Sequence, residues 1–209
     1  DGDGYRLSPH AQLWLTPGHT QEDASLIVEA DDGVYAMTHL WWRSDRTPEI
    51  DPLADDQAAI EAGRARILAT ADIVIISPND PAAMTQYAEE CRAMGIRYIF
   101  DPGQQCARMS GDELADGLAG AYMVICNDYE LELIRQKTGL GETDLLTKVD
   151  LLVVTRGEHG SRVHARYQPP VDVPAVMPRR IEDPTGVGDA YRGGFLKGLA
   201  HRADLVVCA

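Results

Sequence analysis

The short segment from Gly186 to Asp189 combines a glycine loop with a carboxylate at the start of a predicted helix. Gly186 and Gly188 let the backbone turn without a Cβ, so several N–H groups can point in one direction. These groups lie at a helix N-terminus, whose partial positive charge attracts an anion such as phosphate. Asp189 would repel that phosphate. The conflict is resolved if Asp189 takes a proton from a hydroxyl group that attacks a phosphoryl group held by the loop.

A purely structural interpretation of Asp189 is also open. The helix dipole favours an aspartate in the first helical turn, whether or not that residue does chemistry. Two other phosphate loops do not fit the segment. No Gly-Lys-Ser/Thr follows the glycines, as a Walker A loop requires, and Tyr191 stands where a dinucleotide-binding fingerprint needs its third glycine.

Two further motifs follow apolar runs that are typical of buried strands. Asn127 and Glu130 form N-x-x-E, and a single carboxylate can hold magnesium through water because this ion keeps several waters. The same spacing also suits a helix capping box, and both roles are compatible. Thr155, Gly157 and Gly160 form T-x-G-x-x-G, for which a glycine turn between two strands is the ordinary interpretation.

The segment DPTGVGDAYRGGFL, residues 183–196, resembles the C-terminal signature of the ribokinase-like, or PfkB, carbohydrate kinases. That pattern is D-x-T-G-A/V-G-D followed by aromatic, small and glycine residues, and the match covers a dozen positions. The resemblance implies that Asp189 is the catalytic base. It also implies that the backbone of Gly186, Val187 and Gly188 forms an anion hole for the transferred phosphoryl group.

The resemblance extends to the other two motifs. In this family the N-x-x-E motif organises magnesium and the nucleotide phosphates, which implies an ATP contact for Asn127 and a Mg²⁺ role for Glu130. The T-x-G-x-x-G segment lies along the ATP phosphates and ribose. The resemblance therefore implies that Thr155, Gly157 and Gly160 bind ATP.

The stretches ISPNDP and FDPGQQ resemble segments of family members nearest to the nucleoside and adenosine kinases. They make Asn79, Asp101 and Gln104 candidate contacts for the substrate or a phosphate. Arg192 is a fourth candidate, because an arginine just past the catalytic aspartate is associated with the adenosine-kinase-like branch. The alternatives are a capping Asn79, an Asp101 that mainly forms a turn, and a solvated helix arginine.

The elements that must position these residues alternate between strand and helix along the chain. Apolar runs predict inner strands at 72–77, 96–100, 122–127 and 151–155. Periodicity and capping signals predict helices at 55–71, 79–95, 110–118, 128–139 and 185–201. Such alternation implies a mostly parallel sheet with helices on both faces and ligands beyond the carboxyl ends of the strands.

The remaining strand signals predict outer strands and a lid. Residues 161–165 and 171–177 are predicted to be outer strands, and residues 25–39 two short strands about an Asp-Asp-Gly turn. The predicted fold is therefore an α/β, ribokinase-like three-layer sandwich. It carries a small β lid formed by a hairpin at residues 25–40.

Composition excludes several classes of function. The net charge of -14 leaves no basic face for a nucleic-acid binder. No run of 18 apolar residues exists, and the first ten residues lack the apolar core of a signal peptide. We therefore expect a cytoplasmic protein without nucleic-acid or membrane partners.

The cysteines and histidines give no metal signature. No C-x-x-C pair occurs, so a zinc site is not predicted and the four cysteines are expected to be reduced and buried. His159 and His164 have no partner pattern and are interpreted as structural or exposed.

Residues 1–209 are interpreted as one ribokinase-like kinase domain that is incomplete at both ends. The N-terminal Gly-Gly motif and the early sugar-binding aspartate of the family are not found, and helices that pack on the adenine would follow the last residue.

The predicted function is ATP- and Mg²⁺-dependent phosphorylation of a hydroxymethyl group on a nucleoside. A ribokinase- or fructokinase-type sugar kinase and a non-catalytic nucleotide-binding homologue are the alternatives. A homodimer is expected because lid strands often pair between subunits in this family.

Overall fold

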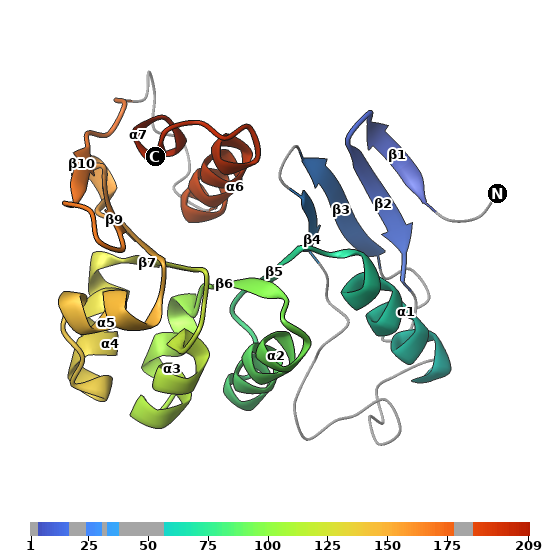
Figure 1. Ribbon diagram of the computed structural model, residues 1–209, viewed down its shortest axis with the longest axis horizontal. Helices are drawn as coiled ribbons and strands as arrows, with labels where there is room; N and C mark the ends of the chain where they lie inside the picture. Colours follow the sequence, from blue (N-terminus) through green and yellow to red (C-terminus); the bar gives the residue numbers. More distant parts are fainter. Residues whose placement is uncertain (1–3, 17–23, 31–32, 38–56, 178–185) are drawn as a thin grey trace.

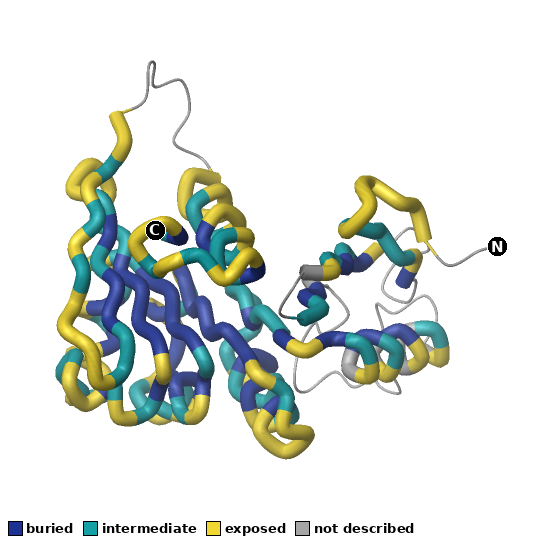
Figure 2. The backbone as a smooth tube through the Cα atoms, turned by 45° about the horizontal axis from the view of Figure 1, so that its top comes forward, coloured by how far each residue is buried: buried dark blue, intermediate teal, exposed yellow. Residues whose placement is uncertain are grey.

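A computed structural model describes residues 4–16, 24–30, 33–37, 57–177 and 186–209 (Figure 1). Within these ranges the strands form one sheet in which they follow one another in sequence order. Its centre consists of the four predicted inner strands, which run parallel. They are β5 (Ile73–Ile76), β6 (Arg97–Phe100), β7 (Met123–Asn127) and β8 (Leu151–Thr155). Figure 2 shows that this central part of the sheet is mostly buried.

Helices cover both faces of this sheet, as predicted (Figure 1). One face carries α2 (Pro81–Met94), α3 (Gly111–Leu118), α4 (Asp128–Thr138) and α5 (Glu142–Lys148). The other face carries α6 (Val187–Ala200) and α7 (Leu205–Cys208). The predicted three-layer α/β architecture is therefore confirmed.

Alternation of side chains along the strands builds the two hydrophobic layers. On β7, Val124 and Cys126 pack into the layer of α2–α5, whereas Met123 and Ile125 pack into the layer that contains Phe195 of α6. Because successive strand residues point to opposite faces, a strand buried on both sides needs an unbroken apolar run. This requirement explains why the inner strands could be read from the sequence.

An antiparallel extension precedes the parallel strands. It comprises β1 (Tyr5–Ser8), β2 (Ala11–Leu15), β3 (Ala24–Ala30) and β4 (Gly33–Met37). Helix α1 (Gln57–Thr70) packs against β3 and β4 through Ile67, and Ala71 directly after the helix joins the same cluster. The predicted hairpin is β3–β4, and β4 continues the main sheet by pairing in parallel with β5. Residues 31–32 and 38–40 of the predicted hairpin lie outside the described residues, and the lid role stays a prediction. Strands β1 and β2 were not predicted.

The local signals at the helix ends work as expected. Asp80 caps α2 by accepting the Ala83 N–H at 3.2 Å, and Gly95 ends this helix in the left-handed conformation at φ 68°. Ser110 and Glu113 form a complete capping box at the start of α3.

Several outer elements differ from the sequence prediction. Strand β9 (Ser161–Ala165) is confirmed, but β10 covers only Val171–Val173 because Pro174 cannot donate a hydrogen bond to a ladder. Helices α5 and α7 were not predicted, and neither were the 3₁₀ turns η1 (Gly103–Ala107) and η2 (Gly157–His159). These elements are only three to seven residues long, so none shows a clear helical period.

The four cysteines are free and buried, as predicted. Burial raises the pKa of the Cys91 and Cys106 thiols to about 12, so both are protonated at neutral pH.

Among the helices of the described ranges, none combines the length and apolar character needed to cross a membrane.

The contact between α3 and β6 gives a prediction about stability. A Cβ on Gly117 would lie 2.2 Å from Phe100 Cζ, and Phe100 is fully buried. Gly117→Ala is expected to lower the free energy of unfolding by about 1–3 kcal/mol through overpacking. The matched control is Gly194→Ala in α6, where a new Cβ would meet no atom within 4 Å. Urea denaturation should show the control neutral or stabilised by roughly 0.5–1 kcal/mol. Equal effects of the two changes would contradict the predicted contact.

Candidate active site

A cavity of about 650 Å³ opens where the four parallel strands end, between their carboxyl ends and α6. Parallel strands place their carboxyl ends at one edge of a sheet, which is where ligands bind in open α/β folds. The volume lies within the usual range for small-molecule sites. The residues that line it are Ile75, Ser77, Pro78, Asp101, Gly103, Gln104, Ile125, Cys126, Asn127, Glu130, Thr155, Gly188, Asp189, Arg192, Gly193 and Leu196.

Asp189 lies in the first turn of α6 and lines this cavity together with Asn127 and Thr155. Its side chain is 76% exposed, so the carboxylate is accessible to a bound molecule. The residue before the helix, Gly186, adopts the left-handed conformation at φ 76°, which favours glycine. Gly188 lines the cavity, whereas Gly186 and Val187 do not.

Asn127 and Glu130 join β7 to α4 through a reciprocal capping box. Asn127 Oδ1 accepts the Glu130 N–H at 2.8 Å, and Glu130 Oε2 accepts the Asn127 N–H at 2.8 Å. The capping interpretation is therefore confirmed, and both side chains also line the cavity. The capping bond uses one oxygen of the Glu130 carboxylate, so the other oxygen can serve a ligand.

Thr155 ends β8 directly beside Asn127 of β7, with which it is paired in the sheet. Gly157 and Gly160 follow it with φ values of 56° and 82°, in the region that favours glycine. Neither glycine lines the cavity. Gly160 instead packs against the end of β10: a Cβ there would lie 1.9 Å from the Val173 carbonyl oxygen. The two glycines thus shape the loop, and Thr155 supplies its cavity-facing side chain.

Arg192 connects the two walls of the cavity. Its guanidinium forms ion pairs with Asp101 at the end of β6 and with Asp189, one turn earlier on α6. The Arg192 and Asp101 side chains are only 15% and 11% exposed. Burial lowers the pKa of Arg192 from its usual value, but an arginine remains charged at neutral pH. Arg192 is the single cationic side chain among the described residues that line the cavity.

The candidate substrate residues divide into two groups. Asp101, Gln104 and Arg192 line the cavity, whereas Asn79 does not. Asn79 Oδ1 instead accepts the N–H of Asp80, the residue that caps α2, at 2.7 Å.

Several residues that line the cavity are not among the predicted site residues, namely Ser77, Pro78, Gly103, Cys126 and Gly193. Their position in the chain, relative to the predicted strands and to Asp189, could have identified them as lining residues. Four of them lie at or just after the end of an inner strand, and Gly193 lies one helical turn beyond Asp189.

Comparison with known proteins gives one family and several relatives. Residues 17–209 match the sequence profile of the pfkB family carbohydrate kinases. The Nucleoside kinase of Methanocaldococcus jannaschii is 31% identical over 138 residues, which are 66% of this chain and 45% of that protein. The Nucleoside kinase of Methanothermobacter thermautotrophicus is 31% identical over 220 residues, 99% of this chain and 66% of that protein.

A solved structure of Burkholderia thailandensis nucleoside kinase in complex with inosine aligns with a TM-score of 0.63 at 38% identity. The alignment covers 66% of this chain and 46% of that one. The same enzyme has been solved in complex with ADP-inosine, with a TM-score of 0.59. The chain thus spans between two fifths and two thirds of the length of these relatives.

The Arg192 bridge gives a second prediction. Arg192→Met would leave the buried Asp101 carboxylate without its partner and should lower the free energy of unfolding by about 3 kcal/mol. Adding Asp101→Asn to that variant should restore part of the loss, because no unpaired charge would remain. A double-mutant cycle followed by urea denaturation measures this coupling. Strictly additive single effects would show that the two side chains do not interact.

Proposed function

Since the chain belongs to the pfkB family of carbohydrate kinases, we propose that it transfers the γ-phosphoryl group of ATP to a hydroxymethyl group of a nucleoside. The observation that carries this proposal is the shared cavity. There an accessible carboxylate, a helix N-terminus and the N-x-x-E capping box meet at one edge of the sheet. The choice of a nucleoside is supported by the relatives, which are named nucleoside kinases and include one solved with inosine.

In the proposed mechanism Asp189 is the general base. Its carboxylate accepts the proton of the acceptor hydroxyl while the hydroxyl oxygen forms a bond to the γ-phosphorus and the bond to the β-phosphate oxygen breaks. The exposed Asp189 side chain can reach a molecule in the cavity.

The N-terminus of α6 is proposed to be the anion hole. The first N–H groups of a helix have no partner within the helix, and they carry partial positive charge. The backbone of Gly186, Val187 and Gly188 would donate to the oxygens of the transferred phosphoryl group, whose charge such fixed donors stabilise. The left-handed Gly186 supports this assignment, since it turns the chain directly into the helix.

ATP is proposed to lie along Asn127 and Thr155, which line the cavity, and to continue along Gly157 and Gly160, which lie outside its wall. Among the described residues, no group of three or more His, Cys, Asp or Glu side chains could hold a metal ion by itself. The single carboxylate of Glu130 fits Mg²⁺, because this ion keeps several waters and binds phosphate oxygens, and Glu130 is proposed as its protein contact. Bound magnesium would neutralise part of the phosphate charge.

Arg192, Asp101 and Gln104 are proposed to contact the substrate or its phosphoryl group. The cavity carries the carboxylates Asp101, Glu130 and Asp189, which would repel a phosphate. Arg192 can offset this repulsion, because a guanidinium binds phosphate oxygens through paired hydrogen bonds. Asn79 remains a sequence prediction that the cavity does not support.

A homodimer formed through the antiparallel extension is part of the proposal. Strand β1 forms the outer edge of the described sheet, and Tyr5 and Leu7 on it are exposed. An exposed strand edge is a template for pairing with another chain.

Asp189→Asn tests the proposed base. The amide keeps the shape of the side chain but cannot accept the proton, so kcat should fall by at least ~100-fold. ATP affinity, measured by calorimetry, should remain nearly unchanged. Asp204→Asn is the matched control, because Asp204 is exposed and makes no capping bond at α7. Wild-type turnover by Asp189→Asn would reject the role of base.

A substrate panel tests the acceptor class. With ATP and Mg²⁺, inosine and other nucleosides should be phosphorylated with a higher kcat/KM than ribose or fructose. Preference for the free sugars would favour the sugar kinase alternative. ATP binding without transfer to any acceptor would favour a non-catalytic nucleotide-binding homologue.

A further inference from the structure

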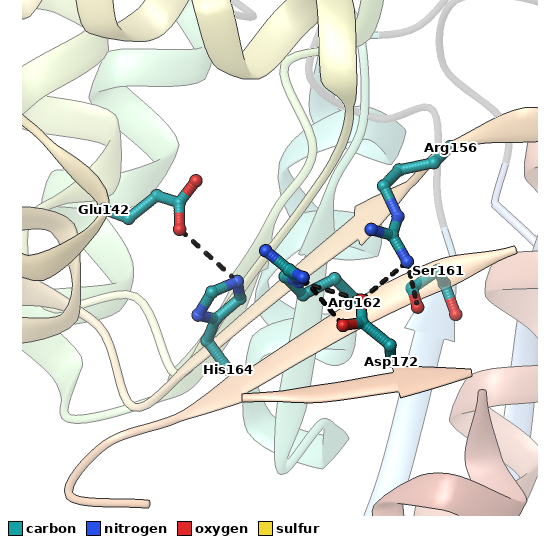
Figure 3. A network of polar contacts seen from close by, with 6 residues as sticks. All are labelled: Glu142, Arg156, Ser161, Arg162, His164 and Asp172. Carbon is teal, nitrogen blue, oxygen red and sulfur yellow. Dashed lines mark hydrogen bonds and ion pairs between the residues drawn. The ribbon is translucent and has the colours of Figure 1, made fainter. Parts of the chain in front are cut away.

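The loop from Thr155 to Gly160 is attached from outside the cavity by an ion network on the last two strands (Figure 3). Asp172 on β10 is its centre. It accepts hydrogen bonds from Arg156 Nη2 at 2.6 Å, from Arg162 Nε at 2.8 Å and from Arg162 Nη2 at 2.7 Å. We call Asp172, Arg156 and Arg162 the Asp172 network.

The geometry of this network distinguishes it from an ordinary surface ion pair. Arg162 binds the Asp172 carboxylate through two parallel bonds, which fixes the orientation of that carboxylate toward Arg156. Arg156 Nη2 also donates to the Ser161 carbonyl oxygen at 3.3 Å. Hydrogen bonds from Arg162 lower the pKa of Asp172 to about 2, so the carboxylate remains ionised throughout the neutral range.

The loop is also attached to the same strand through its backbone. Gly160 lies so close to residues 173–175 that a Cβ would be 1.9 Å from the Val173 carbonyl oxygen and 2.7 Å from the Ala175 nitrogen. Within the loop, the Arg156 N–H donates to the Gly160 carbonyl oxygen at 2.8 Å. The loop is thus held at both ends, by a side chain at Arg156 and by close packing at Gly160.

The Arg156 side chain lies away from the candidate active site. It lines a separate cavity of about 210 Å³, together with Arg162 and His164, and does not line the larger cavity. His164 is buried there with Nε2 3.6 Å from Glu142 Oε2, and burial lowers its pKa. Arg156 is therefore not a candidate contact for a ligand in the larger cavity. Its connection to that cavity runs through the backbone of its neighbour Thr155, which lines the cavity.

We propose that Asp172 is a positioning residue for ATP binding: by holding Arg156, it fixes the backbone from Thr155 to Gly160 in the conformation that lies along the nucleotide phosphates. The two glycines of this loop have more conformational freedom than other residues, so the unattached loop would populate many conformations. Binding would then include the cost of ordering it. This inference rests on the proposed function, which assigns the loop to ATP.

Asp172→Asn tests the inference, with Asp150→Asn as the matched control. Asp150 is also an exposed aspartate paired with an arginine, Arg166 at 3.4 Å, but it lies at the opposite end of β8 from Thr155. Asp172→Asn is expected to weaken ATP binding roughly 5-fold, the scale of a good exposed ion pair. The KM for the nucleoside and kcat at saturating ATP should change less than about twofold, and Asp172→Glu should recover part of the ATP affinity.

Hydrogen exchange provides a readout that does not depend on turnover. The amides of residues 156–161 should exchange faster in Asp172→Asn than in the wild type or in Asp150→Asn, because the loop opens more often. Unchanged exchange and unchanged ATP affinity would overturn the inference. An equal loss of ATP and nucleoside affinity would also overturn it, since that result indicates a general structural role. A wild type without kinase activity, combined with faster loop exchange in Asp172→Asn, would reject the proposed function and leave the positioning of the loop standing.

Discussion

The carboxyl ends of β5, β6, β7 and β8 meet at one edge because the four strands are parallel and paired in register. Every polar group of the candidate site depends on this arrangement. Asp101, Asn127 and Thr155 come from different parts of the chain, yet each ends or directly follows an inner strand. Helix α6 packs on the face of the sheet opposite to α2–α5, and its N-terminus and Asp189 reach the same edge. The site is thus a consequence of topology, and the residues at the strand ends decide its chemistry.

Charge is the second constraint on the molecule. The chain has a net charge of -14, and three carboxylates line the cavity, so side-chain cations are scarce where a phosphate would bind. Backbone N–H groups at a helix N-terminus attract an anion without adding a net charge. Arg192 adds one buried cation, which in this structure is shared between Asp101 and Asp189. Outside the cavity, Arg156 is likewise bound to a carboxylate, that of Asp172.

The layers and most inner elements could be predicted from the sequence, because buried strands need unbroken apolar runs and helix ends carry local capping signals. The meeting of Asp189 with Asn127 and Thr155 was also predictable, since strand ends and loop motifs define it. Asn79 and the Asp172 network show what could not be predicted from the sequence. The hydrogen bond from the Asp80 N–H to Asn79 and the absence of Asn79 from the cavity wall depend on side-chain direction. Asp172 is separated by 16 residues from Arg156, and such charged surface residues look solvated until strand pairing brings them together.

The central claim is that one cavity holds the phosphoryl group against the α6 N-terminus while Asp189 contacts the acceptor hydroxyl. A crystal structure with a non-hydrolysable ATP analogue, Mg²⁺ and inosine tests it most directly. The account predicts a γ-phosphate bound by the N–H groups of Gly186–Gly188 and a nucleoside hydroxyl about 2.6–3.2 Å from an Asp189 oxygen. A γ-phosphate bound elsewhere, or a hydroxyl that points away from Asp189, would contradict it.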